Sequence, residues 1–342
     1  LLCAVFSDFG PNPSCFKVDE AAKAARDKQA DVVIACGGGS AIDVGKGVAL
    51  TVTNPGTCWE YTERSDHDVK RPSAPRLPII TIPTTAGTGT EATPFAVFNN
   101  PDLKEKSTIV NHVLFPDFSI IDPDLMVTMP PRLTAATGFD AFAHALEAFI
   151  SIHATPFSDL TAKEAMRLIY RYLPQAVQNG ENRIAREKLA WASTLAGAAI
   201  GHIGVTLPHA LGQPVSGLCG MPHGESVAAC TVNILEKSYL ADEERFSAVT
   251  ALLADLAGTP TTGSLTVRER AELCPRLVEK LLNDIGLSVR FSDYGMTEAD
   301  IDKVTKIAVT GYYFDINCHP RKVTEEEIKQ IYTKGLNFKY VS

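Results

Sequence analysis

The sequence lacks the features that mark several common protein classes. Acidic residues outnumber basic ones by 40 to 32 and no Lys/Arg block occurs, so the chain has no electrostatic footprint for nucleic acid or an anionic membrane. No apolar run approaches the roughly 20 residues of a membrane-spanning helix, and no secretory signal pattern opens the chain. We therefore expect a cytoplasmic protein with neither nucleic acid nor membrane as a partner.

The cysteines form no CxxC pair, which argues against a zinc ribbon or a dithiol redox motif. Cys36 and Cys230 lie inside apolar runs, so we expect them to be buried thiols in a reducing compartment. With 342 residues, 45% of them apolar, the chain is long enough for two domains whose cores need no disulfides.

The two most familiar nucleotide fingerprints are also absent. Ile42 stands where GxGxxG requires glycine, and Ser40 and Gly47 stand where a P-loop requires glycine and serine or threonine. Instead, the run GGGS at 37–40 follows the apolar run DVVIAC and opens a helical stretch at 41–51. Three glycines let backbone N–H groups approach a phosphate, with Ser40 as N-cap or phosphate donor. The alternative is a tight strand-to-helix turn without a ligand.

The chain alternates apolar strand-like runs with helical stretches up to Pro130-Pro131. The expected strands are 31–36, buried on both faces, 78–82, 107–113 and 118–121. Residues 1–10 are typical of a helix end entering a strand, and we expect further residues before Leu1. Nearly every later segment has helical periodicity, as at 162–178, 184–200, 243–256, 268–287 and 324–334. This predicts an α/β nucleotide-binding domain with a parallel sheet at 1–131 and an all-helical domain at 132–342.

A second polar loop, PTTAGTGTE at 83–91, follows the second expected strand. Its threonines and glycines suit hydrogen bonds to ribose or phosphate, and the carboxyl ends of parallel strands are where open α/β sheets bind ligands. The alternative is an ordinary solvated loop.

The helical part contains a set of potential metal ligands. Asp140 and His144 are four residues apart and share a helix face among Phe and Ala residues. That pair alone is equally compatible with a hydrogen-bonded core pair. His209 and His223 each lie near an expected helix start, and one carboxylate with three imidazoles suits Fe²⁺ or Zn²⁺. Among the other histidines we expect His202 in the core and the rest at the surface: His67, His112, His153 and His319.

Taken together, these segments resemble the iron-containing (group III) alcohol dehydrogenase family across essentially the whole chain. The matching stretches, in the family's order, are GGGSAIDVGK (37–46), PTTAGTGTE (83–91), DPDLMVTMP (122–130), GFDAFAHALEAF (138–149), HALG (209–212) and MPHG (221–224). The resemblance implies a dehydroquinate-synthase-like architecture, in which a dinucleotide domain and a helical metal domain enclose the active site. It also implies a homodimer acting on a small alcohol and its aldehyde or ketone.

The resemblance assigns roles to individual residues. The metal ligands would be Asp140, His144, His209 and His223, holding Fe²⁺ or alternatively Zn²⁺ as a Lewis acid, with catalysis by His209 and His223 through the metal. The NAD or NADP site would comprise Gly37, Gly38, Gly39, Ser40, Asp43, Thr84, Thr85, Thr88, Leu125 and Met129.

Two departures from the family pattern matter. Many members carry a proton-relay histidine four residues after the third ligand, where this chain has Gln213. The family's first strand, which often carries the residue that separates NAD from NADP, precedes the segment at 7–13; we expect it to lie before Leu1, and both NAD and NADP stay open.

Three other functions compete with this interpretation. The first is a zinc-dependent polyol dehydrogenase of the glycerol type. The second is a dehydroquinate-synthase-type lyase, which would need more cations than segments 138–149 and 208–224 provide, since these contain no Lys or Arg. The third is a non-catalytic binding module with a structural metal. Four side chains hint at an apolar substrate pocket: Phe139, Phe142, Phe149 and Leu218.

Overall fold

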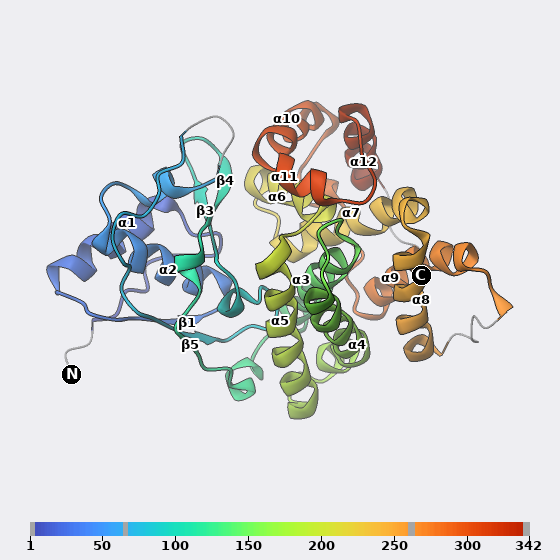
Figure 1. The fold of residues 1–342 in the computed structure, drawn as a ribbon, viewed down its shortest axis with the longest axis horizontal. Coiled ribbons are helices and arrows are strands. Elements are labelled where there is room, and N and C mark those ends of the chain that lie inside the picture. The colour runs from blue at the N-terminus through green and yellow to red at the C-terminus, as the bar shows by residue number, and fades with distance from the viewer. Residues whose placement is uncertain (1–3, 64–67, 259–263, 338–342) are drawn as a thin grey trace.

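The computed structural model describes residues 4–63, 68–258 and 264–337, which form an α/β part and a helical part lying side by side (Figure 1). The α/β part contains α1 (Cys15–Asp27), β1 (Val33–Gly37), α2 (Gly39–Thr53), β2 (Ile79–Pro83), β3 (Phe95–Asn100), β4 (Glu105–Val110) and β5 (Phe118–Ser119). The helical part starts with α3 at Pro131, a residue whose fixed φ suits the first position of a helix.

Three of the expected strands form a parallel sheet in the order β1-β2-β5, with Val33 beside Ile79 and Ile80 beside Phe118. The expected strand at 107–113 does not join this sheet. It is β4, which pairs antiparallel with β3, a strand that the sequence analysis missed. Only residues 101–104 connect β3 to β4, and a parallel crossover needs a dozen residues or more.

The first strand is buried on one face only, which corrects the expectation of burial on both. Ala35 lies under Gly45 of α2, whereas Ile34 is 58% exposed and Cys36 is also exposed. In the described part of the chain, nothing covers this second face. The apolar composition of the strand therefore overstated its burial, and residues 4–10 likewise form no strand.

The helical part is built around α3 (Pro131–Ile150), whose last thirteen residues are all buried. Around it lie α4 (Pro156–Gln178), α5 (Arg183–Ile203), α7 (His223–Ser238) and α8 (Glu243–Ala257). The remaining helices are α6 (Leu207–Cys219), α9 (Val267–Asp284), α10 (Ile301–Gly311), α11 (Tyr313–Cys318) and α12 (Glu325–Asn337). All five helical ranges expected from periodicity are confirmed; their ends differ by at most three residues, except that α4 begins six residues before the expected start.

The loop after β2 docks directly onto the helical part. Gly89 has a left-handed φ of 58°, and a Cβ on Gly197 of α5 would lie 2.2 Å from the Gly89 carbonyl oxygen. This backbone-to-backbone contact fixes the polar loop against the helices that carry the histidines.

None of the described helices is by itself long and apolar enough to cross a membrane; α5 and α6, bent by 102° at their junction, meet that criterion only as a pair.

Candidate active site

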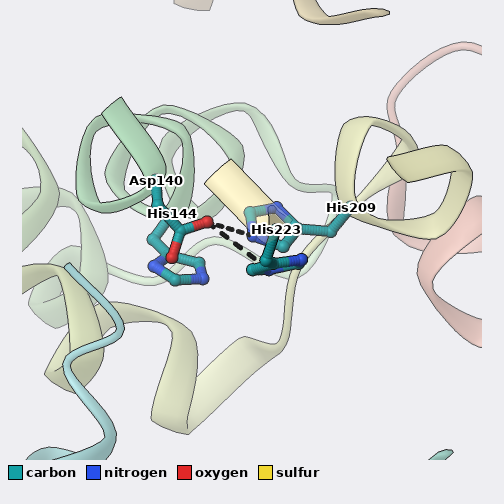
Figure 2. A group of neighbouring side chains, drawn as sticks. All are labelled: Asp140, His144, His209 and His223. Carbon is teal, nitrogen blue, oxygen red and sulfur yellow. Dashed lines mark ion pairs between the residues drawn. The ribbon is translucent and has the colours of Figure 1, made fainter. Parts of the chain in front are cut away.

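The four candidate ligands converge on one point, as expected from the sequence (Figure 2). Asp140 and His144 lie one turn apart on α3, His209 is in the first turn of α6, and His223 begins α7. One donor atom from each residue lies within 4.8 Å of the others. Three segments far apart in sequence thus supply four donors to one centre.

Each of the four residues has one buried polar side-chain atom for which the described part of the chain supplies no hydrogen bond. Among the described residues, the buried atoms without a hydrogen bond include Asp140 Oδ1, His144 Nδ1, His209 Nε2 and His223 Nδ1. The closest contacts are the 3.4 Å separations of Asp140 Oδ1 from His209 Nε2 and from His223 Nε2. Buried polar atoms are normally satisfied, so unpaired donors from all four residues fit a divalent cation.

The electrostatics of the cluster also favour a cation. Burial would raise the pKa of Asp140, but the three imidazoles hold it well below its usual value. Burial lowers the pKa of His144 to about 4 and drives that of His223 down as well. The ionised carboxylate and the neutral imidazoles of His144 and His223 match the protonation states that metal ligation requires, whereas His209, whose pKa is raised, would give up its Nε2 proton to a bound cation.

Glu147 is a candidate supporting residue that the sequence analysis did not assign. Its Oε1 lies 2.5 Å from His209 Nδ1, and its Oε2 accepts from the Thr206 backbone N–H at 2.7 Å. Burial would lower the pKa of His209, but Glu147 and Asp140 together raise it to about 10. Glu147 thus holds the ring with Nε2 toward the centre, the usual role of a carboxylate behind a metal-bound histidine. It lies seven residues after Asp140 on α3, a helical spacing that could have revealed it.

The glycine run follows the end of β1, as expected. Gly37 ends the strand, Gly38 is the N-cap of α2, and a Cβ on Gly39 would lie 2.6 Å from the Thr88 side chain. Ser40 lies inside the first turn of α2, so its expected N-cap role is wrong. Free N–H groups at this helix start still suit a pyrophosphate.

A buried ion network connects the glycine run to the polar loop. Lys46 donates to the carbonyl oxygens of Thr90, Thr93 and Phe95 at 2.7–2.8 Å. Asp43, next to it on α2, accepts from the Thr90 hydroxyl at 2.8 Å and from the Val97 N–H at 3.1 Å. The hydrogen bonds of Lys46 and Asp43 therefore set the position of the loop that carries the threonines.

One cavity of about 810 Å³ joins the two halves of the site. It is lined by ten of the residues expected at the site, namely Gly38, Gly39, Ser40, Asp43, Thr85, Thr88, Asp140, His144, His209 and His223. Gly37 and Thr84 do not line the cavity but join its two loops, because the Thr84 N–H donates to the Gly37 carbonyl oxygen at 2.8 Å. Leu125 is 41% exposed and Met129 is buried in the helical core; neither lines this cavity, so their contact with nucleotide stays a prediction.

The cavity contains charged residues that the sequence analysis did not single out. Lys106 reaches the cavity from β4 and supplies a cation, which segments 138–149 and 208–224 lack. Burial lowers the pKa of Lys106, and the charges of Asp43 and Asp140 oppose that shift. Asp315, from α11, contributes a carboxyl group. Gln213 also lines the cavity, and its Oε1 lies 3.3 Å from the Tyr312 hydroxyl.

The apolar part of the lining differs from expectation. Phe139, Phe142 and Phe149 are buried in the helical core, and Leu218 packs against it. The cavity instead takes its apolar surface mainly from Phe9, Phe95, Val97, Val110, Leu133, Ile200, Val205 and Phe314. Periodicity identified these residues as apolar, but it does not tell which apolar side chains face the cavity and which face the core.

Two histidines are placed differently from expectation. His202 is exposed at the surface of α5 rather than in the core. His319 is fully buried, with Nε2 2.8 Å from Ser238 Oγ, and burial lowers its pKa to about 4. His112 and His153 are exposed as expected, and His67 lies outside the described residues.

Comparison with known proteins agrees with this geometry. The family model described as iron-containing alcohol dehydrogenase matches residues 1–123, and that for the C-terminal part of the Fe-containing alcohol dehydrogenase family matches 134–336. A 1,3-propanediol dehydrogenase of Klebsiella pneumoniae is 37% identical over 97% of this chain and 83% of its own length. An NAD-dependent methanol dehydrogenase of Bacillus methanolicus is 34% identical over 97% and 84%.

Solved structures match equally well. An archaeal halo-thermophilic alcohol dehydrogenase from a Red Sea brine pool superimposes with a TM-score of 0.91 at 33% identity, over 97% of this chain and 83% of that one. The chain thus shares with these enzymes its parallel nucleotide-binding sheet, its helical metal-binding half and more than 30% of its sequence. It belongs to the iron-containing alcohol dehydrogenase family and is an alcohol dehydrogenase.

Proposed function

We propose that this enzyme oxidises a small alcohol, and reduces the corresponding aldehyde or ketone, with NAD or NADP and a divalent metal, Fe²⁺ in the first instance. The observation that carries the proposal is the set of four unpaired donors facing the same cavity as the glycine run. When bound, the metal supplies Lewis acidity toward the substrate oxygen, and the nicotinamide supplies the hydride acceptor or donor.

The residues of the chain divide the remaining work. Asp140, His144, His209 and His223 hold the ion, while Glu147 fixes the ring of His209. Gly38, Gly39 and Ser40 offer backbone N–H groups to the pyrophosphate, with Thr85 and Thr88 facing them across the cavity. The cavity that these residues share would hold substrate and cofactor side by side, and orienting both reactants is what the chain itself would contribute to the rate.

The proposal is tested by assaying short alcohols and aldehydes with each cofactor, following the absorbance of the reduced nicotinamide. The protein is purified without a tag, stripped with chelator, and reloaded with Fe²⁺ or Zn²⁺. We expect turnover to depend on metal and to be higher with Fe²⁺. Full activity of the stripped protein would refute the metal-dependent mechanism, and higher activity with Zn²⁺ would favour the zinc polyol dehydrogenase.

We further propose that the enzyme is cytoplasmic and forms a homodimer. In each chain, the boundary between the two domains lies between residues 131 and 132. Light scattering coupled to size-exclusion chromatography tests the dimer. A monomeric, fully active protein would contradict it.

A further inference from the structure

Asp315 is a cavity residue to which neither the metal set nor the glycine run gives a role. It lies on the short helix α11, and its carboxyl group faces the same cavity as His209 and Gln213. Its Oδ1 is 3.8 Å from where a Cβ on Gly204 would stand, in the segment that leads into α6 and His209. Asp315 is therefore at the metal end of the cavity, not at the glycine end.

Within the described residues this carboxyl group has no hydrogen bond or ion pair. Neighbouring polar groups are already engaged: the Tyr312 hydroxyl donates to the Lys106 carbonyl at 2.7 Å, and Lys106 Nζ donates to Asn12 at 3.1 Å. Burial raises the pKa of Asp315 to about 7, with Glu147 adding to the rise and His209 opposing it. Asp315 is only partly exposed and lines the cavity, so its carboxyl group is open to a ligand that supplies a hydrogen-bond donor.

The chemistry of this group limits what the rest of the substrate can be. An alkyl tail would leave the carboxyl group unpaired, and a carboxylate or sulfonate would meet a like charge whenever Asp315 is ionised. A hydroxyl group suits it in both protonation states, because it donates to a carboxylate and accepts from a carboxylic acid.

We propose that the preferred substrate is a diol or polyol, whose second hydroxyl group bonds to Asp315 while the reacting hydroxyl group faces the metal ligands. This inference rests on the proposed function and narrows its substrate class. Sites built to hydrogen-bond a substrate hydroxyl reject the analogue that lacks it far more strongly than apolar pockets reject a size mismatch.

The test compares 1-propanol, 1,3-propanediol and 3-hydroxypropanoate, three alcohols of equal chain length, with the metal-loaded enzyme. We expect wild type to prefer 1,3-propanediol, measured by kcat/KM. Asp315→Leu should reduce the diol-to-propanol ratio about ten-fold or more, the usual effect of losing a hydrogen bond to a charged group. Asp315→Asn keeps an acceptor and should reduce that ratio less, while improving 3-hydroxypropanoate. Asp255→Asn, an exposed carboxylate on α8, is the matched control.

A binding measurement makes the result independent of turnover. With the reduced cofactor present, the Kd of 1,3-propanediol should rise about ten-fold in Asp315→Leu while that of 1-propanol does not. An unchanged ratio in both measurements would overturn the role of Asp315 while leaving the dehydrogenase intact. A wild-type enzyme that oxidises none of the three alcohols, nor any other short alcohol with either cofactor, would instead contradict the proposed function.

Discussion

The two halves of the active site are built from different parts of the polypeptide. The helical half offers side chains: within the described residues, Asp140, His144, His209 and His223 each have a buried polar atom without a hydrogen bond. The α/β half offers mainly backbone, since its glycines leave N–H groups open at the start of α2. The difference shows why the helical half of the site requires particular side chains, whereas the α/β half requires glycines, which have none. Changes in the helical half should abolish metal binding, and changes in the α/β half should weaken nucleotide binding.

The largest effect should follow from His209→Ala. It removes one donor and leaves Glu147 without its partner, so we expect loss of bound metal and a fall in turnover of about 1,000-fold or more. Metal analysis and the steady-state rate measure both. His202→Ala, an exposed histidine of the neighbouring helix, is the control. Nucleotide affinity should change little; a comparable loss of nucleotide binding would break the separation between the halves.

Next should come Lys46→Met in the α/β half. The change leaves three buried carbonyl oxygens without their donor and removes the positive charge that acts on Asp43; each buried acceptor left unsatisfied costs about 1–3 kcal/mol. Denaturant unfolding should show this loss, and nucleotide affinity should fall because the threonine loop is released. Lys188→Met, on the surface of α5, should be near neutral.

The same residue predicts a pH dependence. Burial lowers the pKa of Lys46 from its usual 10.5 to about 8, although Asp43 and Glu91 oppose the shift. Between these values the unfolded chain binds more protons than the folded one, so this group makes the free energy of unfolding rise with pH. The difference in stability between wild type and Lys46→Met should therefore grow from pH 8 to pH 10. A constant difference would show that Lys46 stays protonated in the fold.

Glu147→Gln should have an intermediate effect confined to the metal. The amide keeps the shape but removes the charge behind His209, and loss of such a partner typically costs about 10–100-fold in metal affinity. Competition with a chelator measures the affinity. Glu187→Gln, on the outer face of α5, serves as control. Unchanged affinity would mean that the α6 backbone alone positions the imidazole.

The smallest effect should come from Gly39→Ala. The added methyl group would meet Thr88 at 2.6 Å, so the loop must shift, and we expect the nucleotide Kd to rise about ten-fold. Fluorescence titration with the reduced cofactor measures this, and metal content should stay at the wild-type value. A tighter complex would contradict the close-approach role of the glycine.

Some residues of the candidate site can be predicted from the sequence, and others cannot. Asp140 and His144 are readable because ionisable side chains are conspicuous in an apolar helix, and Glu147 follows from the same periodicity. Lys106 and Asp315 are not readable in this way. They reach the cavity from β4 and α11, and only the packing of these elements against α6 brings them there.

Residue type and spacing determined the two-part architecture, the glycine run and the metal donors, because local periodicity and side-chain chemistry act over a few residues. Tertiary packing alone decided that β4 leaves the parallel sheet, that no described segment covers one face of β1, and that the Asp315 carboxyl group lines the same cavity as the candidate metal ligands. These features depend on contacts between segments that are distant along the chain. The free energies of such contacts cannot be inferred from a local sequence pattern.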